Sequence, residues 1–92
     1  MKKYVIERSV AGVGKNDQAG LSGIAHKSND ALAKLSPRVQ WQQSFVTDDK
    51  TFCIYLADAE ASVHEHARIS GFPASKVTEV VTVFDPTTAS AY

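Results

Sequence analysis

The chain alternates between short runs of β-branched or aromatic residues and longer segments in which apolar residues recur every three or four positions. Four runs are typical of strands, at residues 3–10, 39–47, 51–57 and 77–84. Two segments have helical spacing, at about residues 17–35 and 58–70. The order strand, helix, strand, strand, helix, strand predicts an α+β, ferredoxin-like βαββαβ domain. In this fold both helices cover one face of a four-stranded antiparallel sheet.

The ends of the predicted helices carry capping signals. Asn16 or Asp17 is suited to cap the first helix, because a short polar side chain can accept a hydrogen bond from the free N–H groups of the first turn. Asp58 is suited to cap the second helix in the same way. Gly71 follows the second helix at the position where a left-handed residue ends many helices.

The two middle strands are predicted to form a hairpin around the polar turn at residues 48–50. Placing Val46 opposite Thr51 pairs Ser44 with Cys53 and divides the hairpin into two faces. We predict that the apolar face packs against the helices and the semi-polar face is open. The apolar face comprises Val39, Trp41, Phe45, Phe52, Ile54 and Leu56, and the semi-polar face comprises Gln40, Gln42, Ser44, Cys53 and Tyr55.

The open face of the sheet predicts a homodimer. The first and third strands are central in this topology, so Cys53 and Tyr55 are expected in the middle of the open face. An aromatic patch of this kind is seldom left in water, and a chain of 92 residues buries only a modest core. We therefore expect a second copy to cover the face, as in a dimeric α+β barrel, and expect the dimer surface and the functional surface to coincide.

Composition limits the partners and the compartment. The 10 basic and 10 acidic residues cancel, which argues against a nucleic acid or an anionic membrane as partner. A single cysteine cannot form an internal disulfide, and the apolar run near residue 4 is too short for a signal peptide or a membrane span. We expect a cytoplasmic protein with one domain at residues 1–85 and a flexible tail at residues 86–92.

Three motif resemblances fail on inspection. The segment Gly12-Val13-Gly14-Lys15 is followed by Asn16, where a phosphate-binding loop needs Ser or Thr. His64-Glu65 would need a second histidine at position 68 to form a zinc-protease helix, but that residue is Arg68. Residues 50–55 have the basic start and the aromatics of an RNA-recognition strand but lack its glycine.

Five residues have the chemistry of metal ligands. A Cys53 thiolate binds soft and borderline metals, although a lone cysteine in a strand is more often a small buried hydrophobe. His66 lies at the edge of the inward stripe of its helix, where a packed, hydrogen-bonded histidine is the alternative. Glu7 in a central strand needs a cross-strand partner or a cation. Tyr55 and Ser44 add oxygen donors on the predicted open face.

Several segments together carry a family resemblance. They are Glu7-Arg8, Val39-Gln40-Trp41, Ser44-Phe45-Val46, Cys53-Ile54-Tyr55, Glu65-His66-Ala67-Arg68 and Gly71-Phe72-Pro73-Ala74. From about residue 3 to residue 87 the chain resembles the small nickel-binding, ferredoxin-like proteins of a bacterial family otherwise described as a domain of unknown function. The resemblance implies a homodimeric α+β fold and, in at least one member, nickel binding.

The leading hypothesis is a small homodimeric, non-catalytic protein that binds nickel or another transition metal. Its candidate ligands are Cys53, His66, Glu7, Tyr55 and Ser44, in a site within one protomer or across the dimer. The alternative is a dimeric α+β barrel enzyme, similar to small monooxygenases or isomerases, that uses Glu7 as a general base on a small hydrophobic substrate. A third possibility is a module that only dimerises. A deep apolar cavity favours the enzyme, whereas converging Cys, His and carboxylate groups favour the metal.

Overall fold

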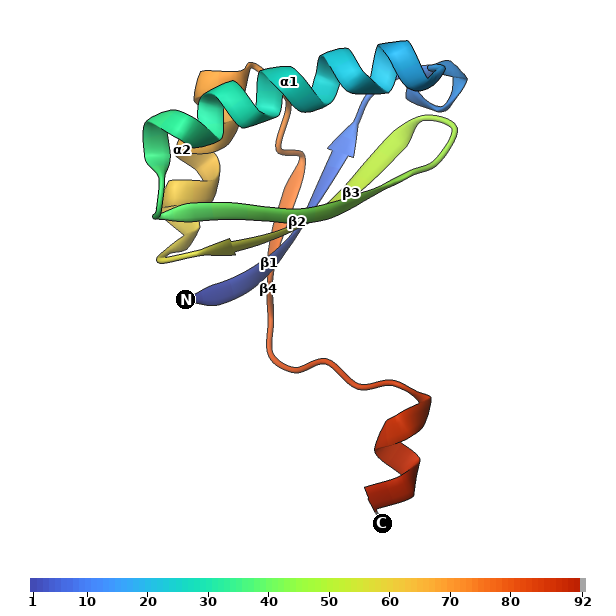
Figure 1. The fold of residues 1–92 in the computed structure, drawn as a ribbon, viewed down its shortest axis with the longest axis vertical. Helices are drawn as coiled ribbons and strands as arrows, with labels where there is room; N and C mark the ends of the chain where they lie inside the picture. Colours follow the sequence, from blue (N-terminus) through green and yellow to red (C-terminus); the bar gives the residue numbers. More distant parts are fainter. Residues whose placement is uncertain (92) are drawn as a thin grey trace.

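The computed structural model describes residues 1–91 and has the predicted order of elements. The strands are β1 (Lys2–Ser9), β2 (Val39–Val46), β3 (Lys50–Ala57) and β4 (Lys76–Val80), and the helices are α1 (Gln18–Leu35) and α2 (Glu60–Ser70). Short 3-10 helices span Val13–Lys15 and Pro86–Ala91. The sheet order is β2-β3-β1-β4 with antiparallel neighbours, so β1 and β3 are central as predicted. Both helices lie on one face of the sheet (Figure 1).

The helix ends follow the capping signals with one exception. Asp17 caps α1, and its side chain accepts a hydrogen bond from a backbone N–H of the first turn at 2.9 Å. The N-cap of α2 is Ala59 rather than Asp58, and the Asp58 carboxylate accepts a hydrogen bond from the Ser62 hydroxyl in the first turn. Gly71 ends α2 with a φ of 78°, the left-handed conformation that glycine adopts without steric cost.

The predicted hairpin register holds from the turn as far as Gln43, which lies opposite Ile54. A β-bulge then inserts an extra residue into β2, so Trp41 pairs with Tyr55 and not, as predicted, with Leu56. The bulge turns Trp41 to the side of the sheet on which Tyr55 lies, and the two rings stack with their centroids 6.5 Å apart.

The prediction of which face the helices cover is wrong for most of the hairpin. Cys53 and Tyr55, predicted on the open face, are buried beneath the helices at 6% and 2% exposure. Phe45, predicted against the helices, is 54% exposed. The physical reason is that both faces of the sheet are apolar, so apolarity alone does not choose the covered one. Neighbouring β1 places Tyr4 and Ile6 in the same buried layer as Cys53 and Tyr55.

The open face consists of side chains from all four strands, with an apolar centre and polar side chains around it. Direct cross-strand pairs place Val5 between Ile54 and Thr78, and Glu7 between Phe52 and Lys76. The apolar members in this face are Val5, Phe45, Phe52, Ile54, Leu56 and Val80. Within the described residues, no helix is both long enough and apolar enough to span a bilayer.

The chain leaves the sheet earlier than predicted. The fourth strand was expected at residues 77–84, but β4 ends at Val80. Beyond it, Val81, Val83 and Phe84 are 93%, 67% and 81% exposed. The segment projects away from the domain and ends in the 3-10 helix at Pro86–Ala91 (Figure 1). The mobility of the predicted tail at residues 86–92 stays a prediction, and residue 92 lies outside the described residues.

Candidate functional site

A buried polar cluster lies between the sheet and the two helices. Ser28 of α1, Tyr55 of β3 and His66 of α2 come together there: the Ser28 Oγ lies 3.4 Å from the Tyr55 hydroxyl and 3.3 Å from His66 Nε2. The Tyr55 and His66 rings are 5.0 Å apart between centroids. His66 was predicted at the edge of the inward-facing stripe of its helix, and in the structure it is completely buried in the core.

His66 is a neutral imidazole at neutral pH. Burial lowers its pKa because a charged ring loses its hydration, and the nearby charge of Arg8 lowers the pKa further. Nε2 lies 3.4 Å from the Ser28 carbonyl oxygen, which assigns the ring proton to Nε2 as donor. His66 Nδ1 is buried and has no hydrogen-bond partner within residues 1–91.

Arg8 is the functional candidate that sequence reasoning missed. Its side chain is only 3% exposed, and Nη1 donates a hydrogen bond to the Pro73 carbonyl oxygen at 2.7 Å. The guanidinium carbon lies 6.0 Å from the ring centroids of both Tyr55 and Phe72. The sequence did contain a signal for its burial. Side chains alternate between the two faces of a strand, so Arg8 falls on the same face of β1 as Tyr4 and Ile6, which is the buried one.

Next to this cluster is a cavity of about 260 Å³ between the sheet and the N-terminal half of α1. Its walls are largely apolar. Three of the predicted site residues, Ser44, Cys53 and Tyr55, line it together with Arg8 and Ser28. A cavity of the kind expected for the enzyme alternative is therefore present, but it lies beneath the helices and not over the open face.

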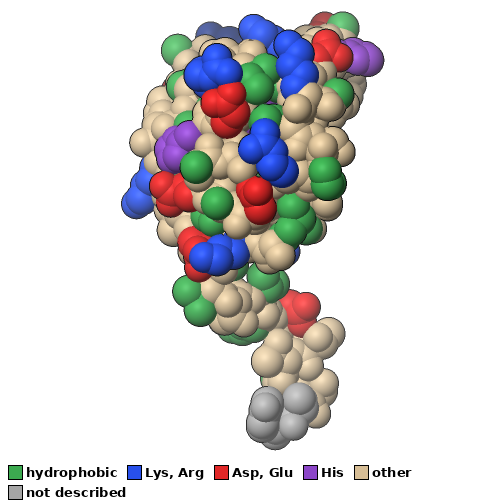
Figure 2. Space-filling model, turned by 90° about the vertical axis from the view of Figure 1, so that its left-hand side faces the viewer, with side chains coloured by type: hydrophobic (Ala, Val, Ile, Leu, Met, Phe, Trp, Pro, Cys, Tyr) green, Lys and Arg blue, Asp and Glu red, His purple; other side chains and the backbone are tan. Residues whose placement is uncertain are grey.

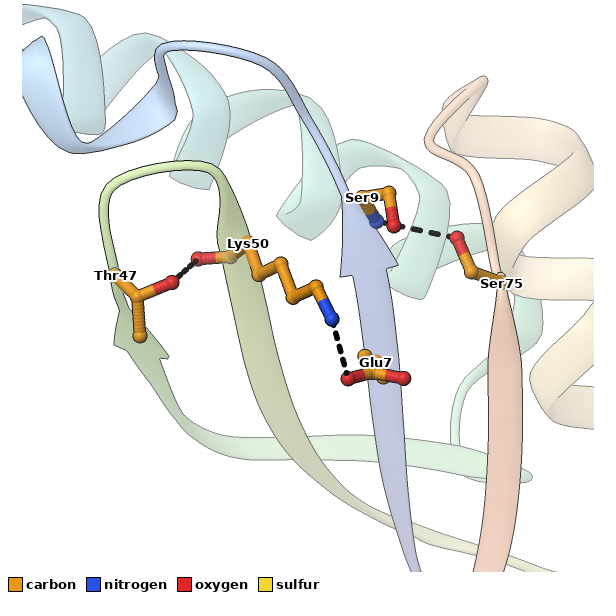
Figure 3. A network of polar contacts seen from close by, with 5 residues as sticks. All are labelled: Glu7, Ser9, Thr47, Lys50 and Ser75. Atoms are coloured by element: carbon orange, nitrogen blue, oxygen red, sulfur yellow. Dashed lines mark hydrogen bonds and ion pairs between the residues drawn. The ribbon is translucent and has the colours of Figure 1, made fainter.

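Glu7 lies on the opposite side of the sheet from the cavity. Its carboxylate forms an ion pair with Lys50 at 3.2 Å, and its side chain is 29% exposed (Figure 3). Of the two alternatives predicted for Glu7, a cross-strand partner or a cation, the structure shows the cross-strand partner, Lys50. Since Glu7 faces away from the cavity, it cannot serve there as the general base on which the enzyme alternative depended.

The five predicted ligands do not meet at one point. Cys53, Tyr55 and Ser44 line the cavity, His66 lies behind Tyr55, and Glu7 is on the other face. Within residues 1–91, no three His, Cys, Asp or Glu side chains are placed to hold a metal ion together. The buried positive charge of Arg8 would also repel a cation. The predicted set therefore does not fit a metal site within one protomer.

The fold and the site together define a small ferredoxin-like α+β protein with a cavity between its helices and its sheet. The chain belongs to the SCO4226-like family of nickel-responsive proteins, whose model matches residues 4–80. This confirms the family resemblance read from the sequence. No curated protein matches the chain by sequence.

A crystal structure of SCO4226 from Streptomyces coelicolor A3(2) has the same fold. It superimposes with a TM-score of 0.73 at 13% sequence identity, over 89% of this chain and 99% of that chain. At this identity the likeness establishes the architecture. It confirms the four-stranded antiparallel sheet with two helices on one face.

Proposed function

We propose that this protein is a homodimeric nickel-binding protein without a reaction of its own. The observation that carries the nickel assignment is the match of the nickel-responsive family model to residues 4–80. The dimer is supported by the apolar centre of the open face of the sheet. The proposed nickel site and the proposed dimer surface both lie away from the buried cluster around Tyr55 and His66.

Two apolar surfaces support the dimer. Ile54 and Leu56 lie in the middle of the open face, on a central strand with no helix above them (Figure 1). The segment at residues 81–84, which leaves the sheet after β4, adds three strongly exposed apolar side chains. Exposed apolar area of this extent marks an association surface, and a second copy of the chain covers both surfaces by symmetry.

The surface charge does not favour a nucleic acid partner. Basic and acidic side chains are interspersed over the side of the molecule in Figure 2, in keeping with a net charge of zero. Binding to a phosphate backbone depends on a concentrated basic surface.

For nickel, the exposed side of α2 offers one donor pair. His64 Nε2 and Glu60 Oε2 lie 3.2 Å apart, one helical turn from each other, and both side chains are about half exposed at 52% and 56%. Imidazole and carboxylate are donors that divalent nickel accepts. Water would fill the remaining positions, so each protomer would carry its own site.

Calorimetric titration of untagged protein with nickel tests this proposal. We expect saturable binding of one ion per protomer, weakened about tenfold or more by His64→Gln because the imidazole donor is lost. Cys53→Ser is the matched control and should leave the affinity unchanged, because the thiol is buried in the cavity wall. Absence of nickel binding would refute the proposed function. If Cys53→Ser weakened nickel binding and His64→Gln did not, the nickel site would have to be assigned to the cavity instead.

A further inference from the structure

The cavity beneath α1 contains a positive charge that the protein leaves without a counter-ion. Arg8 lines the cavity, is 3% exposed and forms no ion pair with a carboxylate in the described part of the chain. Its Nη2 is buried and has no hydrogen-bond partner there, while Nη1 is satisfied by Pro73. An arginine stays protonated even when buried, so this charge cannot be removed by titration. A buried charge without a partner is strongly unfavourable.

The surroundings of the guanidinium compensate only part of this cost. The rings of Tyr55 and Phe72 each lie 6.0 Å from it and provide weak cation–π attraction. Both rings also line the cavity. Phe72 is partly exposed, whereas Tyr55 is buried, so access to Nη2 from the cavity would require the Phe72 ring and not the Tyr55 ring to move. Nη2 is an amino group with two N–H donors, and its place in the planar guanidinium suits it to a carboxylate oxygen.

The rest of the cavity is suited to an apolar body. Its walls include Val13, Leu21, Ile24, Trp41 and Val46, and a few hydroxyl groups such as that of Ser28 interrupt them. Its volume of about 260 Å³ is near the lower end of the range for small-molecule sites, roughly 300–1,000 Å³. This size excludes a peptide or a nucleotide and admits a compact organic acid.

We propose that the cavity binds a small carboxylic acid with an apolar body, whose carboxylate pairs with the Arg8 guanidinium. The body of the acid occupies the space between α1 and the sheet, against Trp41. This inference does not depend on nickel or on the dimer, because it rests on the cavity and the unpartnered charge of a single protomer.

The test compares two molecules of the same shape that differ in charge. Benzoate and benzamide are titrated into the protein while the fluorescence of Trp41, the only tryptophan in the chain, reports occupancy of the cavity. We expect saturable binding of benzoate at least about tenfold tighter than that of benzamide, because only benzoate satisfies the guanidinium. Equal binding of the two probes to the wild-type protein, or no binding of either, would overturn the proposal without any variant being needed.

Two variants assign the effect to Arg8. Arg8→Met replaces the guanidinium side chain by a shorter, uncharged and unbranched one, so it should abolish the preference for benzoate. Its melting temperature should not fall, since an apolar replacement of an unpaired buried charge is neutral or stabilising. Arg68→Met, on an exposed residue of α2, is the control and should keep the preference. A preference for benzoate that survives in Arg8→Met would contradict the proposal. Arg8→Gln, which also removes the charge, supplies the same comparison should Arg8→Met not fold.

Discussion

The two faces of the sheet are both apolar, yet only the face beneath the helices has buried polar chemistry. On β3 the change occurs between neighbours: Ile54 faces the open side, whereas Tyr55 faces His66 and Arg8. The covered face has a cavity and an unpartnered charge, and the open face has aliphatic and aromatic side chains with one ion pair. The comparison therefore separates the proposed ligand site from the proposed association surface. The sequence had predicted one surface for both.

The largest expected effect is on association. Ile54→Asp places a charge in the centre of the open face, and an uncompensated buried charge costs about 3–5 kcal/mol, more than a hundredfold in affinity. We propose that the wild-type protein is dimeric, and sedimentation velocity should show monomers of the variant under the same conditions. Ala33→Asp puts the same charge on an exposed position of α1 and should leave the dimer intact. A dimer that persists in Ile54→Asp would place the association surface elsewhere.

The next effect is on the covered face. His66→Ala removes a completely buried ring and leaves a cavity beside Ser28 and Tyr55. We expect the free energy of unfolding to fall by about 2–4 kcal/mol. The exposed His64 on the same helix is the comparison, and His64→Ala should change stability by less than about 0.5 kcal/mol. Urea denaturation at one fixed protein concentration measures both. Similar losses in the two variants would mean that His66 is not packed as described.

The pH dependence of stability should also come from the covered face. The pKa of His66 is lowered below its ordinary value of 6.5 by burial, so the unfolded chain binds a proton that the folded chain does not. Stability is therefore fully present above pH 6.5 and is lost as the pH falls through the folded pKa, by at most about 1.4 kcal/mol per pH unit for one proton. Thermal unfolding between pH 7 and pH 5 should show this loss, and His66→Gln should reduce it. An unchanged slope in His66→Gln would assign the dependence to other groups.

The smallest effect belongs to the ion pair on the open face. Glu7→Gln breaks the contact with Lys50, and both side chains are partly exposed, so solvent screening limits the loss of stability to less than about 1 kcal/mol. Its effect on benzoate binding should be nil, because Glu7 lies across the sheet from the cavity. Weaker benzoate binding in Glu7→Gln, measured by Trp41 fluorescence, would show that the two faces communicate.

The order of elements, the central position of β1 and β3 and the hairpin register near its turn were predictable, because each depends on local periodicity and turn chemistry. Which face the helices cover was not predictable, because both faces of β3 carry aromatic residues, Phe52 on one and Tyr55 on the other. The bulge before Gln43 also has no sequence signal of its own. His66 was found through its helical spacing. Arg8 was missed because a charged residue in a strand is normally assigned to the solvent side.

The separation of the two faces is tested most directly by titrating the Ile54→Asp protein with benzoate while its mass is measured by sedimentation. We predict that the mass falls to that of one protomer while the benzoate dissociation constant, read from Trp41 fluorescence, stays within about twofold of the wild-type value, because Ile54 and the cavity lie on opposite sides of β3. Loss of benzoate binding together with the dimer, in a protein that keeps its far-ultraviolet circular dichroism, would contradict the separation and make the cavity a property of the assembled dimer.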